Sequence, residues 1–203
     1  MPSEPGTALV CFGCGPIPEG ALEQGHVFSA GLHPWDVTDD FENQLIELEN
    51  ILANPRVVAV GECGFDTLKG PSHELQEQAF VRQVELSERY GKPMILHVVR
   101  DFDSVIRLRK QFKPTQKWLI HGFRGGLAQM DQLYAQGILV SFGLKHNPES
   151  LRTVPSDRLF LESDGKCSIE DVIRAVSLLR NESEEDIVLS VKKSIFARFL
   201  KEI

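Results

Sequence analysis

Several short apolar runs of this chain lead into a histidine or a carboxylate. The residues concerned are His33, Glu62, His97, His121, Glu162 and Asp164. Glu62 follows the β-branched run VVAV, and an ionised carboxylate that leaves water loses several kcal/mol unless a cation or a polar group compensates it. Imidazole and carboxylate groups together suit zinc, iron, manganese or nickel, and a carboxylate can bridge two ions. The pattern therefore predicts a metal site that includes Glu62.

The elements that must position these residues alternate between strands and helices. The predicted strands are Leu9–Phe12, Val27–His33, Val57–Glu62, Pro93–His97, Trp118–His121, Leu139–Phe142 and Leu159–Glu162. The predicted helices are Phe41–Leu52, Glu74–Gly91, Phe102–Phe112 and Leu127–Gln136, followed by two closing helices that Ser168 and Ser183 cap. This alternation favours a single α/β domain over residues 1–203, with a parallel sheet that is either open or closed into a barrel. Because the carboxyl ends of parallel strands share one crevice, we expect the site residues to converge there.

Composition and charge exclude several classes of protein. The net charge of −7 repels nucleic acid from most of the surface, so any binding of phosphate must be local and assisted by metal. No apolar run approaches the roughly 20 residues of a membrane span, and the first residues do not resemble a signal peptide. Four cysteines do not form the pattern of a disulfide framework. We therefore expect a cytoplasmic protein that has no membrane partner.

A series of motifs in this chain resembles the TatD family of metal-dependent hydrolases, which are typically deoxyribonucleases on a TIM-barrel fold. In chain order the motifs are GLHPWD, AVGECGFD, QEQAF, PMILHVVRD, LIHGFRGG, GILVSFG and RLFLESD. The resemblance implies hydrolysis of phosphodiester bonds by metal-activated water, with DNA or a smaller phosphate ester as the substrate. It also implies a divalent cofactor, Zn, Mg or Mn, of which the family holds up to two ions.

The resemblance also implies a role for each site residue. Glu62 would bridge two ions, His97 and His121 would bind one of them, and Asp164 would bind the other and help to activate the attacking water. Catalysis would thus depend on Glu62 and Asp164. His33 would face the substrate phosphate. Arg100 lies three residues after His97, where the family usually has an arginine two residues after, and it is a further candidate for a phosphate contact. Arg124, which follows the His121-Gly-Phe turn, is either a phosphate contact or a solvated surface residue.

The chain departs from the family in its opening segment. The family begins with a strand that ends in His-x-His, whereas the first histidine here is His26. Seven predicted strands are also one fewer than a closed barrel has. We therefore predict a TIM-barrel type fold that lacks the first strand, with one bound ion or none. Activity would then be weak or absent, and an upstream segment bearing His-x-His would restore it.

Three alternatives remain open from the sequence. Cys11 and Cys14 could replace the missing histidines as ligands, although one Cys-x-x-Cys pair is weak evidence for a metal. The chain could be a non-catalytic remnant or a binding protein on the same fold. It could also be a metal amidohydrolase that acts on a small amide or lactone, because fold alone does not select the substrate.

Overall fold

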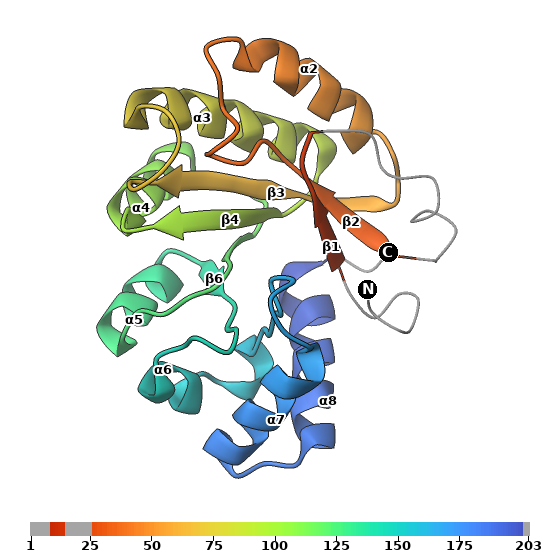
Figure 1. Ribbon diagram of the computed structural model, residues 1–203, viewed down its shortest axis with the longest axis vertical. Coiled ribbons are helices and arrows are strands. Elements are labelled where there is room, and N and C mark those ends of the chain that lie inside the picture. The colour runs from red at the N-terminus through yellow and green to blue at the C-terminus, as the bar shows by residue number, and fades with distance from the viewer. Residues whose placement is uncertain (1–8, 15–25, 201–203) are drawn as a thin grey trace. The chain divides into compact units, whose positions relative to one another are not determined.

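The computed structural model describes residues 9–14 and 26–200 of the chain (Figure 1). They divide into two compact units, Met1–Gln116 and Lys117–Ile203. Strands and helices alternate in both units, and the strands within each unit pair in parallel. The predicted α/β class is therefore confirmed.

The first unit is a sheet of parallel strands covered by helices. Its strands pair in the order β1 (Leu9–Phe12), β2 (Val27–Ala30), β3 (Val57–Asp66) and β4 (Met94–Val99). Helices α2 (Phe41–Leu52) and α3 (His73–Tyr90) pack against β3, and α4 (Phe102–Phe112) follows β4 (Figure 1). The side chains of Val57, Val60 and Phe65 in β3 are fully buried, which is why this strand forms the centre of the unit.

Strand β3 is longer than the sequence predicts. The prediction ended it at Glu62, but it continues to Asp66 after a shift in its register with β4 between Val60 and Cys63. Gly64 makes this possible: its φ is 136°, and a Cβ there would lie 2.3 Å from the carbonyl oxygen of His97. Glu62 is therefore an interior residue of the strand beside an irregularity that re-aims its side chain.

The helix ends of the first unit follow local rules that the sequence displays. Ser72 caps α3 by accepting a hydrogen bond from the Leu75 amide, and Gly91 ends the helix in the left-handed conformation, with φ of 64°. Asp101 caps α4 through the Ser104 amide. The predicted bounds of α2 and α4 agree with the structure, and those of α3 differ by one residue at each end.

The second unit has two strands and a series of helices. Strands β5 (Trp118–Ile120) and β6 (Ile138–Val140) pair in parallel. The helices are α5 (Leu127–Ala135), α6 (Pro148–Thr153), η1 (Ser156–Arg158), α7 (Ile169–Arg180), α8 (Glu184–Ser194) and η2 (Ile195–Phe199). Ser168 and Ser183 cap α7 and α8 by accepting hydrogen bonds from Asp171 and Asp186, which confirms the two closing helices.

The seventh predicted strand is not a strand in the structure. Leu159–Glu162 contributes only an isolated bridge between Phe142 and Leu161. The 3-10 helix η1 immediately precedes this segment, and Asp164 just after it has a φ of 49°, so too few extended residues remain for a ladder. Six strands are thus present in the part of the chain that the structure describes.

Several other strand bounds differ from the prediction. Strand β2 ends at Ala30, and the chain turns at residues 34–36. At Gly31 the backbone passes close to β3, because a Cβ there would lie 2.6 Å from the Cα of Gly61. Strand β4 extends past His97 to Val99, whereas β5 and β6 end before His121 and Ser141. The site histidines therefore lie within or just after strands.

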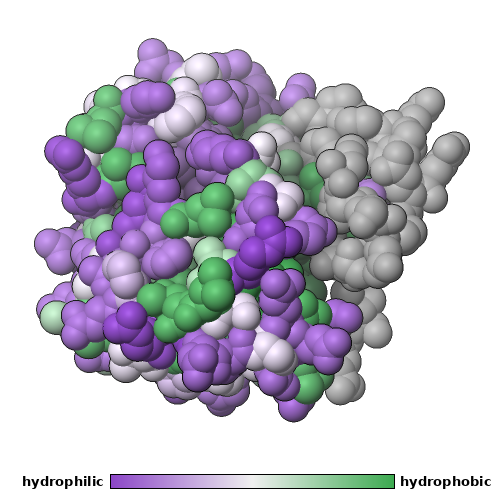
Figure 2. All heavy atoms as spheres, turned by 60° about the horizontal axis from the view of Figure 1, so that its bottom comes forward, coloured by the Kyte–Doolittle hydropathy of each residue, from purple (hydrophilic) through white to green (hydrophobic). Residues whose placement is uncertain are grey.

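The surface is mainly polar. On the face shown in Figure 2, hydrophilic side chains predominate and hydrophobic ones form a few separate patches. Among the residues described, no helix combines the length and the apolar composition needed to cross a bilayer.

Candidate active site

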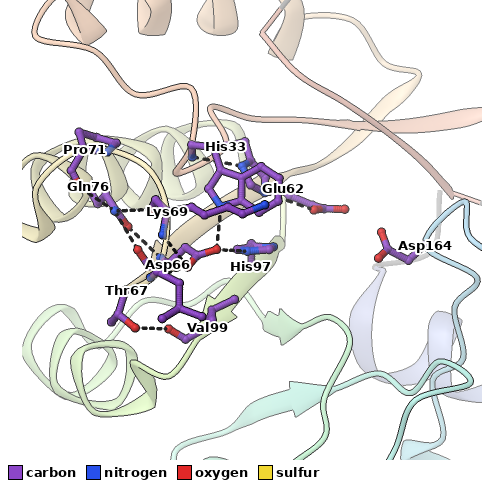
Figure 3. A network of polar contacts seen from close by, with 12 residues as sticks. His33, Glu62, Asp66, Thr67, Lys69, Pro71, Gln76, His97, Val99 and Asp164 are labelled. Carbon is purple, nitrogen blue, oxygen red and sulfur yellow. Dashed lines mark hydrogen bonds and ion pairs between the residues drawn. The ribbon is translucent and has the colours of Figure 1, made fainter.

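Three of the predicted site residues lie together in the first unit. His33 follows β2, Glu62 lies in β3 and His97 lies in β4. One ligand atom of each lies within 4.8 Å of the others, and the His33 Nε2 is 3.9 Å from a Glu62 carboxylate oxygen (Figure 3). Their side chains are between 13% and 21% exposed, so the cluster is partly open to solvent. An imidazole–carboxylate cluster of this kind could hold a divalent cation.

A second carboxylate, Asp66, orients His97. It lies four residues after Glu62 in β3, and its Oδ2 is 3.3 Å from the Nε2 of His97 (Figure 3). Burial raises the pKa of Asp66, but hydrogen bonds from Trp35, Leu68 and His97 outweigh burial and lower this pKa overall. An ionised acceptor beside Nε2 places the proton of His97 on that nitrogen and the basic lone pair on Nδ1. Histidine ligands of metals are commonly oriented by a carboxylate in this way.

His33 has a different hydrogen-bond pattern. Its Nδ1 accepts a hydrogen bond from the backbone amide of Trp35 across 3.2 Å. The neutral ring therefore carries its proton on Nε2, the atom that faces Glu62. This arrangement suits a hydrogen-bond donor to an anion better than a metal ligand.

The second unit contains a similar pair of a histidine and a carboxylate. The Nδ1 of His121 is 3.5 Å from Oε1 of Glu162. The Ser141 hydroxyl donates to Oε2 of the same carboxylate, which also accepts a hydrogen bond from the Gly122 amide. Burial raises the pKa of Glu162, but these hydrogen bonds outweigh burial and lower it. A ring nitrogen of His121 and a carboxylate oxygen of Asp164 lie within 4.8 Å of each other. Glu162 thus orients His121 as Asp66 orients His97.

The remaining predicted residues lie at the ends of these elements. Arg100 follows β4 with a φ of 62°, and Arg124 lies in the segment after β5; both side chains are exposed. Asp164 is paired with Lys166. The sequence-based prediction that Glu62, His97, His121 and Asp164 converge involves both units, and the convergence stays a prediction.

The Cys-x-x-Cys pair has few features of a metal site. Cys11 is exposed, and Cys14 has its pKa raised to about 12 by burial and by the charges of Asp36 and Glu47. A metal would have to displace the proton of this thiol, because the thiolate is the form that binds.

Sequence reasoning missed Asp66 and Trp35, and it missed the role of Glu162. Asp66 could have been found, because residues i and i+4 of a strand share a face and Glu62 was already a candidate. Glu162 was noticed as an acid at the end of a run, but its bond to His121 depends on tertiary structure. For Trp35, the sequence gives no signal beyond its position two residues after His33.

Comparison with known proteins places the chain in a family. Residues 19–197 match the model of the family described as TatD related DNase. The chain is 27% identical over 202 residues to the 3'-5' ssDNA/RNA exonuclease TatD of Erwinia amylovora, an alignment that covers 85% of this chain and 76% of the relative. It is 30% identical over 148 residues to YcfH of Escherichia coli K12, named a metal-dependent hydrolase, with 68% and 55% covered.

A solved structure gives the fold. The TatD homolog YJJV from Escherichia coli K12 superimposes with a TM-score of 0.75 and 23% identity, covering 88% of this chain and 80% of that one. This likeness confirms the expected TIM-barrel type of α/β fold.

Proposed function

Because the chain belongs to the family of TatD related DNases, we propose that this metal-dependent hydrolase cleaves phosphodiester bonds in DNA. The observation that carries the proposal is the group formed by His97, Glu62 and Asp66. In this group one imidazole is oriented by a buried, ionised carboxylate, and a second carboxylate lies beside it. Such a set fits a divalent cation, because a fixed tautomer directs the lone pair of the histidine.

We assign four residues of the chain as metal ligands. They are Glu62, His97, His121 and Asp164, as the family resemblance implies. Support comes from each unit separately: His97 is oriented by Asp66, and His121 is oriented by Glu162. When bound, a divalent ion supplies a lowered pKa for the attacking water and electrostatic stabilisation of negative charge at phosphorus.

The other polar groups act on the water and on the substrate. Asp164 accepts the proton of the attacking water, a role open to an exposed carboxylate. His33 donates its Nε2–H to a phosphate oxygen, since its Nδ1 is already an acceptor for the Trp35 amide. Arg100 and Arg124 supply positive charge to the phosphates of the substrate.

The test combines metal analysis with nuclease assays. The metal content of the purified protein is measured, and hydrolysis of single-stranded and duplex DNA is followed with added Mg, Mn or Zn. The variants His97→Ala and His121→Ala are expected to lose bound metal and activity together. His73→Ala is the matched control, because His73 is half exposed and pairs with Asp101 outside the proposed ligand set.

The results of these assays distinguish the proposed ligands and the alternative functions from one another. Metal retained by His121→Ala with unchanged affinity would remove His121 from the ligand set. Hydrolysis of amides or lactones without cleavage of DNA would favour the amidohydrolase alternative. Inactivity with every metal and every substrate would favour a non-catalytic protein on this fold.

A further inference from the structure

Trp35 is an exposed aromatic residue at the edge of the candidate site. Its side chain belongs to the segment between β2 and α2, and the residue is 45% exposed. A single exposed apolar side chain is ordinary on a protein surface and needs no function by itself. What distinguishes Trp35 is that its ring is held in one orientation beside the two histidines of the first unit.

Several contacts fix the indole. Its Nε1–H donates to Oδ2 of Asp66 across 2.7 Å. Its ring centroid is 4.8 Å from that of His33 and 5.5 Å from that of His97, with interplanar angles of 77° and 76°. The exposed indole therefore lies directly beside the side chains that we propose to contact phosphate and metal.

A lysine stands over the same ring. The Lys69 ammonium lies 4.2 Å from the centroid of the Trp35 ring. No carboxylate forms an ion pair with Lys69 among residues 9–14 and 26–200. An aromatic face and an uncompensated cation are thus presented together in a chain whose net charge is −7.

The segment that carries Lys69 is held in place before any ligand binds. Oδ1 of Asp66 accepts hydrogen bonds from the Leu68 and Lys69 amides. The buried Gln76 side chain donates to the carbonyls of Asp66, Lys69 and Pro71 (Figure 3). Ordering a loop in advance reduces the entropy lost on binding.

We propose that Trp35 and Lys69 form a binding subsite for one unpaired nucleobase and its adjoining phosphate. The base would stack on the indole, and the ammonium would pair with the phosphate. Stacking of this kind tolerates any base, because every base has a π-face, and it requires a base that is not paired in a duplex. The inference rests on the proposed function and deepens it, because it names the residues of this chain that would hold an unpaired base and its phosphate beside the candidate site.

The experiment measures binding without hydrolysis. Fluorescence anisotropy in EDTA compares a labelled oligothymidylate with an abasic oligonucleotide of the same length. Trp35→Phe keeps an aromatic face but loses the bond to Asp66, whereas Trp35→Leu loses both. Phe112→Leu is the matched control, an exposed aromatic residue at the end of α4 that is 37% exposed.

We expect the wild type and Phe112→Leu to bind the oligothymidylate more tightly than the abasic strand. Trp35→Leu should weaken binding of the oligothymidylate by roughly 5- to 100-fold and leave the abasic strand unaffected. Trp35→Phe should retain most of the affinity. Lys69→Met should weaken both strands alike and reduce the salt dependence by about one phosphate contact.

Two results would overturn the subsite. One is equal affinity of the wild type for both strands, and the other is an equal loss in Trp35→Phe and Trp35→Leu, which would trace the effect to the Asp66 bond. Hydrolysis of methyl p-nitrophenyl phosphate with Mn, measured on the same preparations, tests the proposed phosphodiesterase activity separately. Selective binding without hydrolysis would then retain the subsite and reject the proposed function, and hydrolysis without selective binding would do the reverse.

Discussion

The Trp35 indole and the His97 imidazole share one hydrogen-bond acceptor, Oδ2 of Asp66. The two nitrogens lie 2.7 Å and 3.3 Å from that oxygen. The carboxylate therefore fixes an exposed aromatic ring and a proposed metal ligand at the same time. A change at Asp66 should affect metal binding and nucleic acid binding together.

Replacement of Asp66 by Asn is expected to weaken metal binding by about 10- to 100-fold, because a neutral amide no longer holds the proton of His97 on Nε2. Isothermal titration with Zn or Mn measures the affinity. Asp39→Asn removes the same charge from an exposed position outside the cluster and should bind metal like the wild type. An Asp66→Asn protein with wild-type affinity would show that the carboxylate does not orient a ligand.

In the second unit, the carboxylate that orients a histidine is expected to contribute to stability. Glu162→Gln removes the charge that faces His121 and weakens the bonds from Ser141 and Gly122. We expect a loss of about 1–3 kcal/mol in the free energy of unfolding, measured with urea, because the bonded acceptor is charged and its side chain is only 17% exposed. Glu170→Gln, an exposed acid in the first turn of α7, is the control. Equal stability of the two variants would contradict this account of Glu162.

Glu88 makes the stability of the first unit dependent on pH. Its carboxylate accepts hydrogen bonds from the amide and hydroxyl of Thr115 and from the amide of Gln116. Burial raises the pKa of Glu88, but these bonds outweigh burial and lower it. A carboxyl with a lowered folded-state pKa adds stability above its unfolded pKa, about 4.3, and loses that stability as pH falls through the folded value.

The expected result is that Glu88→Gln is less stable than the wild type by about 0.5–1 kcal/mol at pH 7, because solvent screens these partly exposed bonds, and that this difference narrows below roughly pH 4. Urea unfolding at a series of pH values measures it. Glu85→Gln changes an acid on the same helix that is about half exposed and is expected to differ little. A gap that stays constant down to acidic pH would contradict the role of the charge.

A substitution of Gly64 by Ala tests whether the close approach of β3 to β4 requires a glycine. An alanine there would adopt a φ of 136° and place its Cβ 2.3 Å from the His97 carbonyl oxygen, so we expect a loss of stability of about 2–4 kcal/mol. Gly91→Ala is the matched control, because Gly91 also has a positive φ but no heavy atom lies within 4 Å of its Cβ position. It should cost only about 1–2 kcal/mol. Similar losses for both variants would show that contact with β4 is unimportant.

The sequence predicted the helices better than the strands, for a physical reason. Helix ends are set by nearby residues, such as the Ser72 cap and the Gly91 stop of α3, and these are visible in the chain. The extension of β3 past Glu62 depends instead on β4, which tolerates close approach at Gly64. No local pattern reports that contact.

The candidate site was also predicted only in part from the sequence. Residues that follow apolar runs, such as His97 and His121, could be named because strand ends carry function in parallel α/β folds. The pairing of each histidine with its carboxylate could not be named, because Asp66 and Glu162 meet their partners through tertiary packing. The role of His33 as a donor also depends on its bond to the Trp35 amide, which only coordinates reveal.

The hydrogen bonds that the Gln76 and Asp66 side chains make to the segment after β3 affect the rate at which its amide hydrogens exchange with solvent. The residues from Thr67 to Gly70 are exposed, and the amide hydrogens of such a loop ordinarily exchange fast. Here the Asp66 amide donates to Gln76 and the Leu68 and Lys69 amides donate to Asp66. The Asp66 amide can exchange only when the buried Gln76 side chain withdraws, so its protection should follow that of α3. The Leu68 and Lys69 amides can exchange only when the Asp66 carboxylate releases them, so they should be protected although they lie at the surface.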